Sequence, residues 1–262
     1  MKYYNLKQKK LIIKEMTEKG ICVIDNVFNK KQIEKYKKNI TQIYKKRLKL
    51  GESVGSTNNQ CIYNFFYENL DLMPLVYIRK LDKLLQKLLN ESYVLQSSNA
   101  QNRLVEKIKK NNKNFKIGNN WHTDSRYIND KRISNGFSYL VIIALEDFND
   151  NTASTQFIQN SFKNFKKPKR FARQKYNTLK MKSGSICLMD TGLIHRGGVS
   201  TKTSRWSVFN IYTPWFVKPY FNYKKLLGKK ANKLKKDEKK ILHFFSEPPR
   251  SQNERINTLT KY

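Results

Sequence analysis

The apolar segment at residues 137–145 (FSYLVIIAL) constrains the fold of this chain more than any other. Its side chains are almost all apolar, and several of them are β-branched or aromatic. This composition over so short a run is typical of a strand that is buried on both faces. We therefore expect a central strand here, with other parts of the chain packed on each side of it.

Helical spacing dominates before this segment, and the period-two pattern of strands dominates from residue 92 onward. Expected strands lie at 21–27, 93–105, 155–159, 186–189 and 205–212, and expected helices at 7–19, 30–49, 74–89 and 229–245. Gly20 is expected to end the first helix and Asn29 to cap the second. Roughly eight short strands after a helical start predict a mainly β fold with flanking helices. Its predicted form is a double-stranded β-helix (jelly roll, cupin-like) with the N-terminal helices packed outside the sheet.

The chain has 262 residues, which is enough for one large domain, and β-barrels of this size commonly remain undivided. We expect a single domain over 1–262, with helical support over about 1–90, a β-helix core over about 92–217 and a basic tail over 218–262. The hydrophobic share of 39% is low, but an aromatic share of 13% supplies large side chains for a core.

The formal net charge is +33, from 53 Lys and Arg against 20 Asp and Glu. Such a charge indicates either an anionic partner or a genome rich in lysine codons, and the residues alone leave both open. The three cysteines are odd in number and widely spaced, which favours free thiols in a reducing compartment. No apolar run approaches the roughly 20 residues of a membrane span, and the first residues have no apolar signal core. We expect a cytoplasmic protein.

A His-x-Asp motif lies at His122 and Asp124 (WHTDS), in a chain that has only three histidines. On an extended segment the two side chains point to the same side, and a third metal ligand is expected from His195 (LIHRGG). Two histidines and one carboxylate form the facial triad that leaves positions on Fe(II) open. The alternative is a structural hydrogen bond between a histidine and an aspartate in the core. Arg205 follows ten residues after His195, where a guanidinium could hold a carboxylate.

This order of motifs resembles the Fe(II)/2-oxoglutarate-dependent dioxygenases, and the flanking segments are similar to the phytanoyl-CoA dioxygenase family. The similar segments are 20–28 (GICVIDNVF), 121–124 (WHTD), 151–161 (NTASTQFIQNS), 183–198 (SGSICLMDTGLIHRGG) and 205–214 (RWSVFNIYTP). The chain departs from the family at Asn160, Ser161 and Phe162, where a Gly-Ser-His turn is usual, and its gap from the distal histidine to the arginine is one residue shorter. Both departures concern the substrate side.

The resemblance implies Fe(II), 2-oxoglutarate and dioxygen as cofactors, with His122, Asp124 and His195 as catalytic metal ligands. The implied reaction is hydroxylation of an unactivated C–H bond, with release of succinate and carbon dioxide. In halogenating relatives a small residue replaces the carboxylate, so the presence of Asp124 favours hydroxylation.

Three polar positions are expected to bind 2-oxoglutarate. Arg205 is the predicted anchor of the distal carboxylate, because a buried carboxylate needs a cation. Ser207, one strand period further on the same face, could add a hydroxyl donor. Asn102, with its neighbour Gln101, is expected to face the 1-carboxylate.

Other residues are expected to have packing roles. Trp121 is expected to pack against the metal-bearing strand. Tyr139 could line the pocket, but a core position is the preferred interpretation, and His243 is expected to be an interfacial or core histidine and not a ligand. The basic segment 163–173 could lie near the pocket mouth and favour an anionic substrate, or it could be a solvated loop.

Two other functions stay open at this point. The charge and the aromatic residues could indicate a nucleic-acid-binding or nucleic-acid-modifying oxygenase. The motif spacing typical of base-repair oxygenases is different, however, with two arginines well after the distal histidine. The lysines here also do not cluster in one module. A non-enzymatic cupin-like metal protein is disfavoured because structural metal sites are normally closed. We expect a small-molecule substrate, no specific nucleic-acid partner, and an oligomeric state that the sequence does not define.

Overall fold

The computed structural model describes residues 2–52, 54–56, 59–89, 92–105, 121–128, 131–168, 175–198, 202–246, 248 and 251–258. The strands are β1 Tyr3–Tyr4, β2 Ile21–Ile24, β3 Gly55–Ser56, β4 Asn59–Tyr63, β5 Tyr93–Arg103, β6 Tyr127–Ile128, β7 Lys131–Arg132, β8 Tyr139–Ala144, β9 Gln156–Phe157, β10 Asn177–Thr178, β11 Ile186–Asp190, β12 His195–Arg196 and β13 Arg205–Pro214. The α-helices are α1 Lys9–Lys19, α2 Lys30–Lys49, α3 Asp82–Leu89, α4 Tyr223–Leu227, α5 Lys236–Ile241 and α6 Gln252–Thr258. The 3₁₀ helices are η1 Phe65–Tyr67, η2 Leu70–Leu75, η3 Arg79–Leu81, η4 Ser161–Lys163 and η5 Gly228–Lys233.

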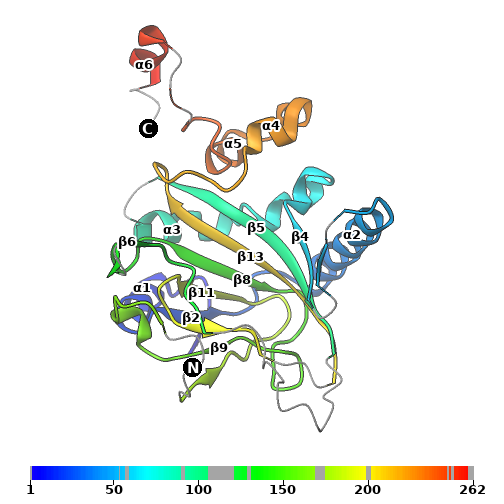
Figure 1. Cartoon of the computed structure of the whole chain (residues 1–262), viewed down its shortest axis with the longest axis vertical. Coiled ribbons are helices and arrows are strands. Elements are labelled where there is room, and N and C mark those ends of the chain that lie inside the picture. The colour runs from blue at the N-terminus through cyan, green and yellow to red at the C-terminus, as the bar shows by residue number, and fades with distance from the viewer. Residues whose placement is uncertain are drawn as a thin grey trace.

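Most of the strands belong to one large sheet with the order β1-β2-β11-β8-β13-β5-β4-β3 (Figure 1). Neighbouring strands in it are antiparallel except for the β1–β2 pair. A second sheet has the order β10-β9-β12, and β6 pairs with β7. The helices α4 and α5 lie beyond the ends of β5 and β13.

The strand β8 is buried on both faces, as the apolar segment predicts. Leu140 and Ile142 belong to a cluster between the two sheets, together with Phe157 from β9. Val141 and Ile143 belong to the larger cluster on the other face. That cluster also holds residues of the helices, namely Ile12 of α1, Ile40 of α2 and Leu85 of α3. Because successive side chains of β8 point to opposite faces, one face of the strand packs against the helices and the other faces the small sheet.

Local signals set the first two helices. Gly20 takes a left-handed conformation (φ 70°) and its N–H bonds to the carbonyl of Met16, which ends α1. The side chain of Asn29 accepts a hydrogen bond from the backbone N–H of Gln32 (2.9 Å), and the side chain of Gln32 accepts one from the N–H of Asn29 (2.9 Å). Both predicted helix boundaries are confirmed.

The helix predicted at 74–89 is wrong in its first half. Only α3 is α-helical there, preceded by η2 and η3. The side chains of Asn210 and Tyr212 on β13 donate to the carbonyls of Leu75 (2.7 Å) and Val76 (2.6 Å). Tertiary contacts thus take the acceptors that an α-helix would use for its own hydrogen bonds.

The helix predicted at 229–245 is also wrong, because the segment is divided. Leu234 and Lys235 are extended between η5 and α5. The side chain of Glu238 then accepts a hydrogen bond from the N–H of Lys235 (2.8 Å), which starts α5. His243 has a positive φ of 63°, so no helix continues through it.

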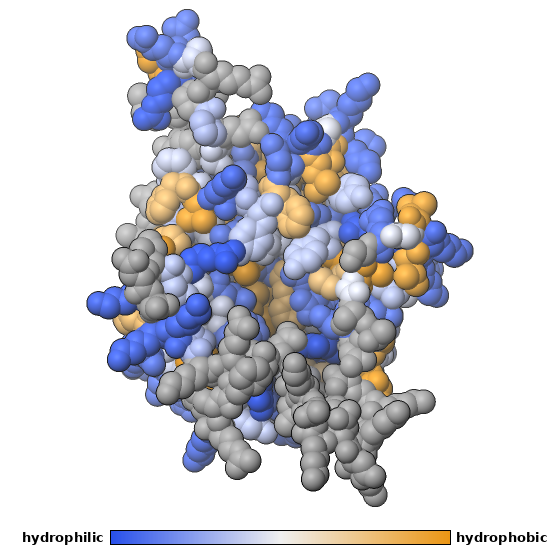
Figure 2. All heavy atoms as spheres, viewed as in Figure 1, coloured by the Kyte–Doolittle hydropathy of each residue, from blue (hydrophilic) through white to orange (hydrophobic). Residues whose placement is uncertain are grey.

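Hydrophilic residues cover much of the face in Figure 2, interrupted by small groups of hydrophobic ones. The described residues contain no helix that is long and apolar enough to cross a membrane.

Candidate active site

The backbone brings the two motif histidines together. The N–H of His122 donates to the carbonyl of His195 (3.0 Å), and the N–H of His195 donates to the carbonyl of His122 (2.9 Å). This antiparallel bridge extends the small sheet beyond β12. The N–H of Asp124 donates to the carbonyl of Thr191 (2.9 Å), which fixes the turn after His122. Residues about 70 positions apart thus converge through main-chain hydrogen bonds.

The three side chains fit a metal ion. His122, Asp124 and His195 each offer one ligand atom, and these atoms all lie within 4.8 Å of one another. Nε2 of His195 is 3.5 Å from Oδ2 of Asp124. Nδ1 of His195 lies 2.9 Å from the carbonyl of Leu193, which can only accept, so Nδ1 carries the proton and Nε2 has a lone pair for a metal. Nitrogen and oxygen donors of this kind suit Fe(II).

The triad lies in a cavity of about 230 Å³ between the two sheets. Its described lining includes three arginines (Arg103, Arg196, Arg205), polar residues of β5 (Ser97, Asn99, Gln101) and apolar residues of β8 and β13 (Leu140, Phe209, Ile211). Asp124 is the one carboxylate in this described lining. The cavity therefore favours anionic ligands.

Arg205 is almost fully buried, with 2% of its surface exposed. Its Nε donates to the carbonyl of Thr152 (2.8 Å), its Nη2 to the carbonyl of Ala153 (3.1 Å) and its Nη1 to Oγ of Ser207 (2.8 Å). A guanidinium has five N–H donors, so these bonds to described residues leave one N–H on each terminal nitrogen for a ligand. Burial, and then the charge of Arg103, lower the pKa of Arg205 to about 9. An anion in the cavity would raise the pKa of Arg205 again and so oppose both effects.

The other residues predicted to bind the co-substrate have different outcomes in the structure. Ser207 is buried and contacts the guanidinium of Arg205, on the face that the strand period predicts. Gln101 lines the cavity and donates to Oδ1 of Asn99 (2.9 Å). The prediction for Asn102 is wrong, because its side chain donates to Gln60 on β4 (2.9 Å) and does not line the cavity. Adjacent residues of a strand point to opposite faces, so only one of the two neighbours can face the metal.

The packing predictions can be compared with the structure as well. Trp121 is buried, and the guanidinium of Arg196 lies 4.2 Å from its ring centroid. Tyr139 is buried in the helix-side cluster. Of the basic segment 163–173, residues 169–173 lie outside the described residues, and none of the others lines the metal cavity.

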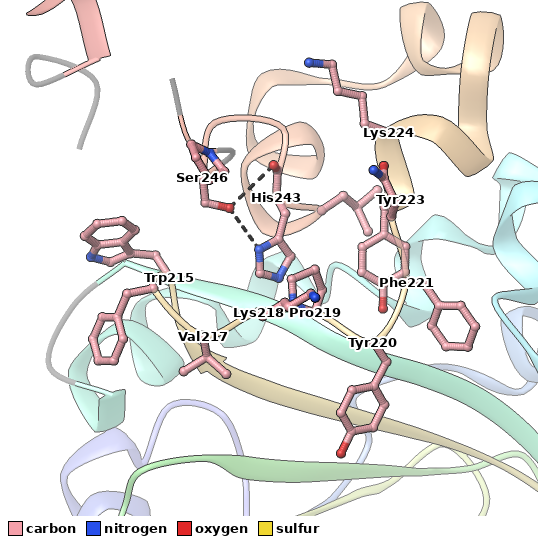
Figure 3. Close-up of a pocket in the computed structure, with 14 residues that line it drawn as sticks. Trp215, Val217, Lys218, Pro219, Tyr220, Phe221, Tyr223, Lys224, His243 and Ser246 are labelled. Carbon is pink, nitrogen blue, oxygen red and sulfur yellow. Dashed lines mark hydrogen bonds between the residues drawn. The ribbon is translucent and has the colours of Figure 1, made fainter. Parts of the chain in front are cut away.

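His243 lies in a separate cavity of about 550 Å³, formed by residues 215–224 and the segment after α5 (Figure 3). Its Nε2 donates to the carbonyl of Leu95 (3.0 Å), and its Nδ1 is 2.9 Å from Oγ of Ser246. Burial lowers the pKa of His243 from 6.5 to about 4. Tyr220 borders both cavities, and its ring points away from His243. The larger cavity is therefore distinct from the metal cavity and holds none of the triad.

Sequence reasoning missed several residues of the metal cavity. They are Arg103, Arg196, Tyr63 and Tyr220. The period-two pattern could have indicated Arg103, because it lies two residues after Gln101 on a predicted strand. Tyr63 is far along the chain from any motif, and Tyr220 follows the 205–214 segment without belonging to it, so only the fold brings the two tyrosines to the site.

A jelly roll that holds two histidines and one carboxylate in a cavity defines the class of non-haem iron oxygenases. The family model for phytanoyl-CoA dioxygenase (PhyH) matches residues 16–206, and the chain belongs to this family. This confirms the resemblance of the motifs. It also confirms the enzyme class and its cofactors, Fe(II), 2-oxoglutarate and dioxygen.

Several solved structures have the same fold. HygX from Streptomyces hygroscopicus, with nickel, 2-oxoglutarate and hygromycin B bound, has a TM-score of 0.63 at 14% identity, covering 83% of this chain and 91% of that chain. The carbocyclase SnoK from nogalamycin biosynthesis has a TM-score of 0.65 at 12% identity, covering 90% and 94%. The epimerase SnoN, in complex with Fe3+, alpha ketoglutarate and nogalamycin RO, has a TM-score of 0.62 at 15% identity, covering 81% and 87%. These likenesses confirm the predicted jelly-roll fold. In a separate comparison of sequences, no curated protein matches the chain.

Proposed function

We propose that the chain hydroxylates an unactivated C–H bond of a small molecule and releases succinate and carbon dioxide from 2-oxoglutarate. The observation that carries this proposal is the convergence of His122, Asp124 and His195 in one cavity with the buried Arg205. The three converging residues would hold Fe(II) and leave positions on it for ligands. When bound, the iron supplies the activation of dioxygen that the protein's own side chains lack.

Arg205 would hold the distal carboxylate of 2-oxoglutarate. A buried guanidinium is costly without an anion, and its two remaining N–H groups suit the two oxygens of a carboxylate. Ser207, Thr152 and Ala153 keep the guanidinium in place by accepting its other three donors. Gln101, in place of Asn102, would face the 1-carboxylate.

The walls of the cavity have a second task, which is to receive the substrate and limit water. Leu140, Phe209 and Ile211 form an apolar wall within the lining. Such a wall strengthens the electrostatic interactions inside the site. Tyr63 and Tyr220 also border the cavity and are 45% and 46% exposed, so the substrate would enter beside them. The positive lining is accounted for by the dianionic 2-oxoglutarate, and an anionic substrate is the second ligand that it would favour.

Anaerobic titration of the Fe(II) protein with 2-oxoglutarate tests the proposal. We expect the visible charge-transfer band of the chelate in the parent protein, and no such band in His195→Ala, which loses a ligand. His243→Asn is the matched control, because this histidine lies in the other cavity, and its titration should equal that of the parent. The absence of a band in the parent would refute the proposal.

Hydroxylation itself is tested on candidate substrates in air. A substrate should raise the rate of succinate formation and gain one oxygen atom by mass spectrometry. A product without added oxygen would instead indicate a different oxidative outcome at the same site.

A further inference from the structure

The larger cavity, of about 550 Å³, adjoins the metal cavity. Tyr220 borders both of them. Phe221 lines the larger cavity, and its ring centroid is 5.6 Å from that of Tyr63, which lines the metal cavity. A ligand that enters beside Tyr63 and Tyr220 therefore meets both cavities.

The metal cavity is too small for a whole substrate together with 2-oxoglutarate. Its volume is about 230 Å³, whereas cavities that enclose most of a drug-sized ligand usually measure about 300–1,000 Å³. Iron and 2-oxoglutarate would fill part of this volume. The larger cavity lies within the usual range. A substrate of ordinary size would therefore place its reacting part in the metal cavity and the rest of its body in the larger one.

Aromatic side chains dominate the lining of the larger cavity. They are Trp215, Phe216, Tyr220, Phe221 and Tyr223. Figure 3 shows Trp215 and Phe221 at opposite ends of this lining. Phe216 is 63% exposed, so a ligand in the cavity would cover apolar surface that now faces water. Aromatic rings pair favourably with other rings, which makes a ring the fitting occupant.

Polar atoms of this lining already have partners within the fold. The hydroxyl of Tyr223 and Nε2 of His243 donate to the carbonyls of Gln96 (3.2 Å) and Leu95 (3.0 Å) on β5. The N–H of Tyr220 also donates to the carbonyl of Gln96 (3.0 Å), which holds the segment 215–224 against β5. The cavity is thus preformed and offers mainly apolar contact, and a preformed site loses less entropy on binding.

The charges of the larger cavity favour an anion. Lys218 and Lys224 are the charged residues of its described lining, and no Asp or Glu belongs to that lining. Both lysines are exposed, so an anionic group would lie at the solvent side of a bound ring. The metal cavity has instead the apolar wall of Leu140, Phe209 and Ile211, which suits an aliphatic group.

Tyr220, at the boundary, is held from the side of the triad. The guanidinium of Arg126 lies 5.3 Å from the centroid of its ring, and Nη2 of Arg126 donates to its hydroxyl. Arg126 comes two residues after Asp124. The segment that carries the triad is thus connected to the segment that forms the larger cavity.

We propose that the substrate is an organic anion with an aromatic ring, which binds in the larger cavity, and an aliphatic part that extends past Tyr220 into the metal cavity. This inference rests on the proposed function, because it places the reacting C–H bond at the triad. Phe216 and Phe221 would then determine specificity, although neither lines the metal cavity.

The test uses two probes that share a ring and an anion and differ in an aliphatic chain, namely naphthalene-2-sulfonate and 6-hexylnaphthalene-2-sulfonate. Each is titrated anaerobically into the Fe(II) protein with 2-oxoglutarate. Naphthalene fluorescence reports binding, and the visible chelate band is recorded in the same samples. Both probes should bind, but only the hexyl compound should shift the band, because only its chain is expected to reach the metal cavity.

Variants locate the bound ring. Phe216→Ala should weaken both probes roughly 2- to 10-fold, as expected for the loss of one aromatic contact. Phe165→Ala is the matched control, because Phe165 is 38% exposed and belongs to neither described lining, and it should leave the binding nearly unchanged. Lys218→Gln should weaken naphthalene-2-sulfonate roughly 2- to 5-fold without weakening the neutral 2-naphthalenemethanol.

The outcomes separate this inference from the proposed function. A parent protein without a chelate band would refute the proposed function, and with it the substrate role of the larger cavity. A normal parent band without probe binding, or with equal binding in the parent and Phe216→Ala, would overturn the inference alone. Binding that depends on Phe216 without a band shift by the hexyl probe would also overturn it, because the larger cavity would then be a separate ligand site.

Discussion

Replacing Arg205 with lysine should weaken 2-oxoglutarate binding while leaving metal binding nearly unchanged. Lysine keeps the charge but loses the planar fork that can meet both oxygens of a carboxylate. The loss of one charge-assisted hydrogen bond corresponds to about 1.5–3 kcal/mol, which is roughly 10- to 150-fold in affinity. Metal affinity should change much less, because the arginine is not a ligand.

The same substitution should also lower the free energy of unfolding. One ammonium group cannot replace the three bonds that the guanidinium makes to Thr152, Ala153 and Ser207. Thr152 and Ala153 are buried, so a carbonyl left without a donor costs about 1–3 kcal/mol. Urea unfolding of the apoprotein measures this effect separately from the anaerobic titration of the folded Fe(II) protein.

Ser207→Ala is the control for Arg205→Lys, because it removes one acceptor and keeps the fork. We expect it to reduce 2-oxoglutarate affinity by only about 0.5–1.5 kcal/mol. Folded Arg205→Lys with an unchanged 2-oxoglutarate titration would refute the anchor. An equal fall in metal affinity would also refute the reasoning.

Three further predictions concern stability and surface charge. The folded-state pKa of His243 is about 4, below its ordinary 6.5, so the unfolded chain takes up the proton first as the pH falls. Lowering the pH from about 7 to about 5 should therefore reduce the free energy of unfolding, measured with urea, by roughly 2 kcal/mol. His243→Asn should lose this part of the pH dependence. Ile142→Ala, at a fully buried position of β8, should lower the free energy of unfolding by about 2–5 kcal/mol in the same assay. Duplex DNA binding, measured by fluorescence anisotropy, should be independent of sequence and fall steeply with salt, and sequence-selective binding at physiological salt would contradict the enzyme-only proposal.

The elements that could be predicted from the sequence are those with local causes. The helix at Lys30–Lys49 begins at the predicted cap Asn29, because the capping box uses residues three positions apart. The strand β8 was predictable from its apolar run alone. The interruption of the predicted helix before α3 could not be predicted in this way. The side chains that donate to the carbonyl groups of Leu75 and Val76 come from β13, more than 130 residues away.

The candidate site likewise contains residues that could be predicted from the sequence and residues that could not. His122, Asp124, His195 and Arg205 could be predicted because their order along the chain carries the signal. Their metal and co-substrate roles remain predictions that the titrations test. Asn102 was assigned to the wrong face because a strand pattern gives two faces without saying which one borders the cavity.

The register between β5 and β13 is what turns single residues into a site. Ser207 pairs with Gln101 and Arg205 pairs with Arg103, so the cavity face of one strand continues directly onto the cavity face of the other. A slip of one residue would exchange the two faces of β5 and bring Asn102 into the cavity in place of Gln101 and Arg103. The pairing is fixed by long-range packing of both strands in the large sheet, which no local pattern of β5 encodes. The positive charge that Arg103 and Arg205 bring to the cavity is therefore a property of the folded register.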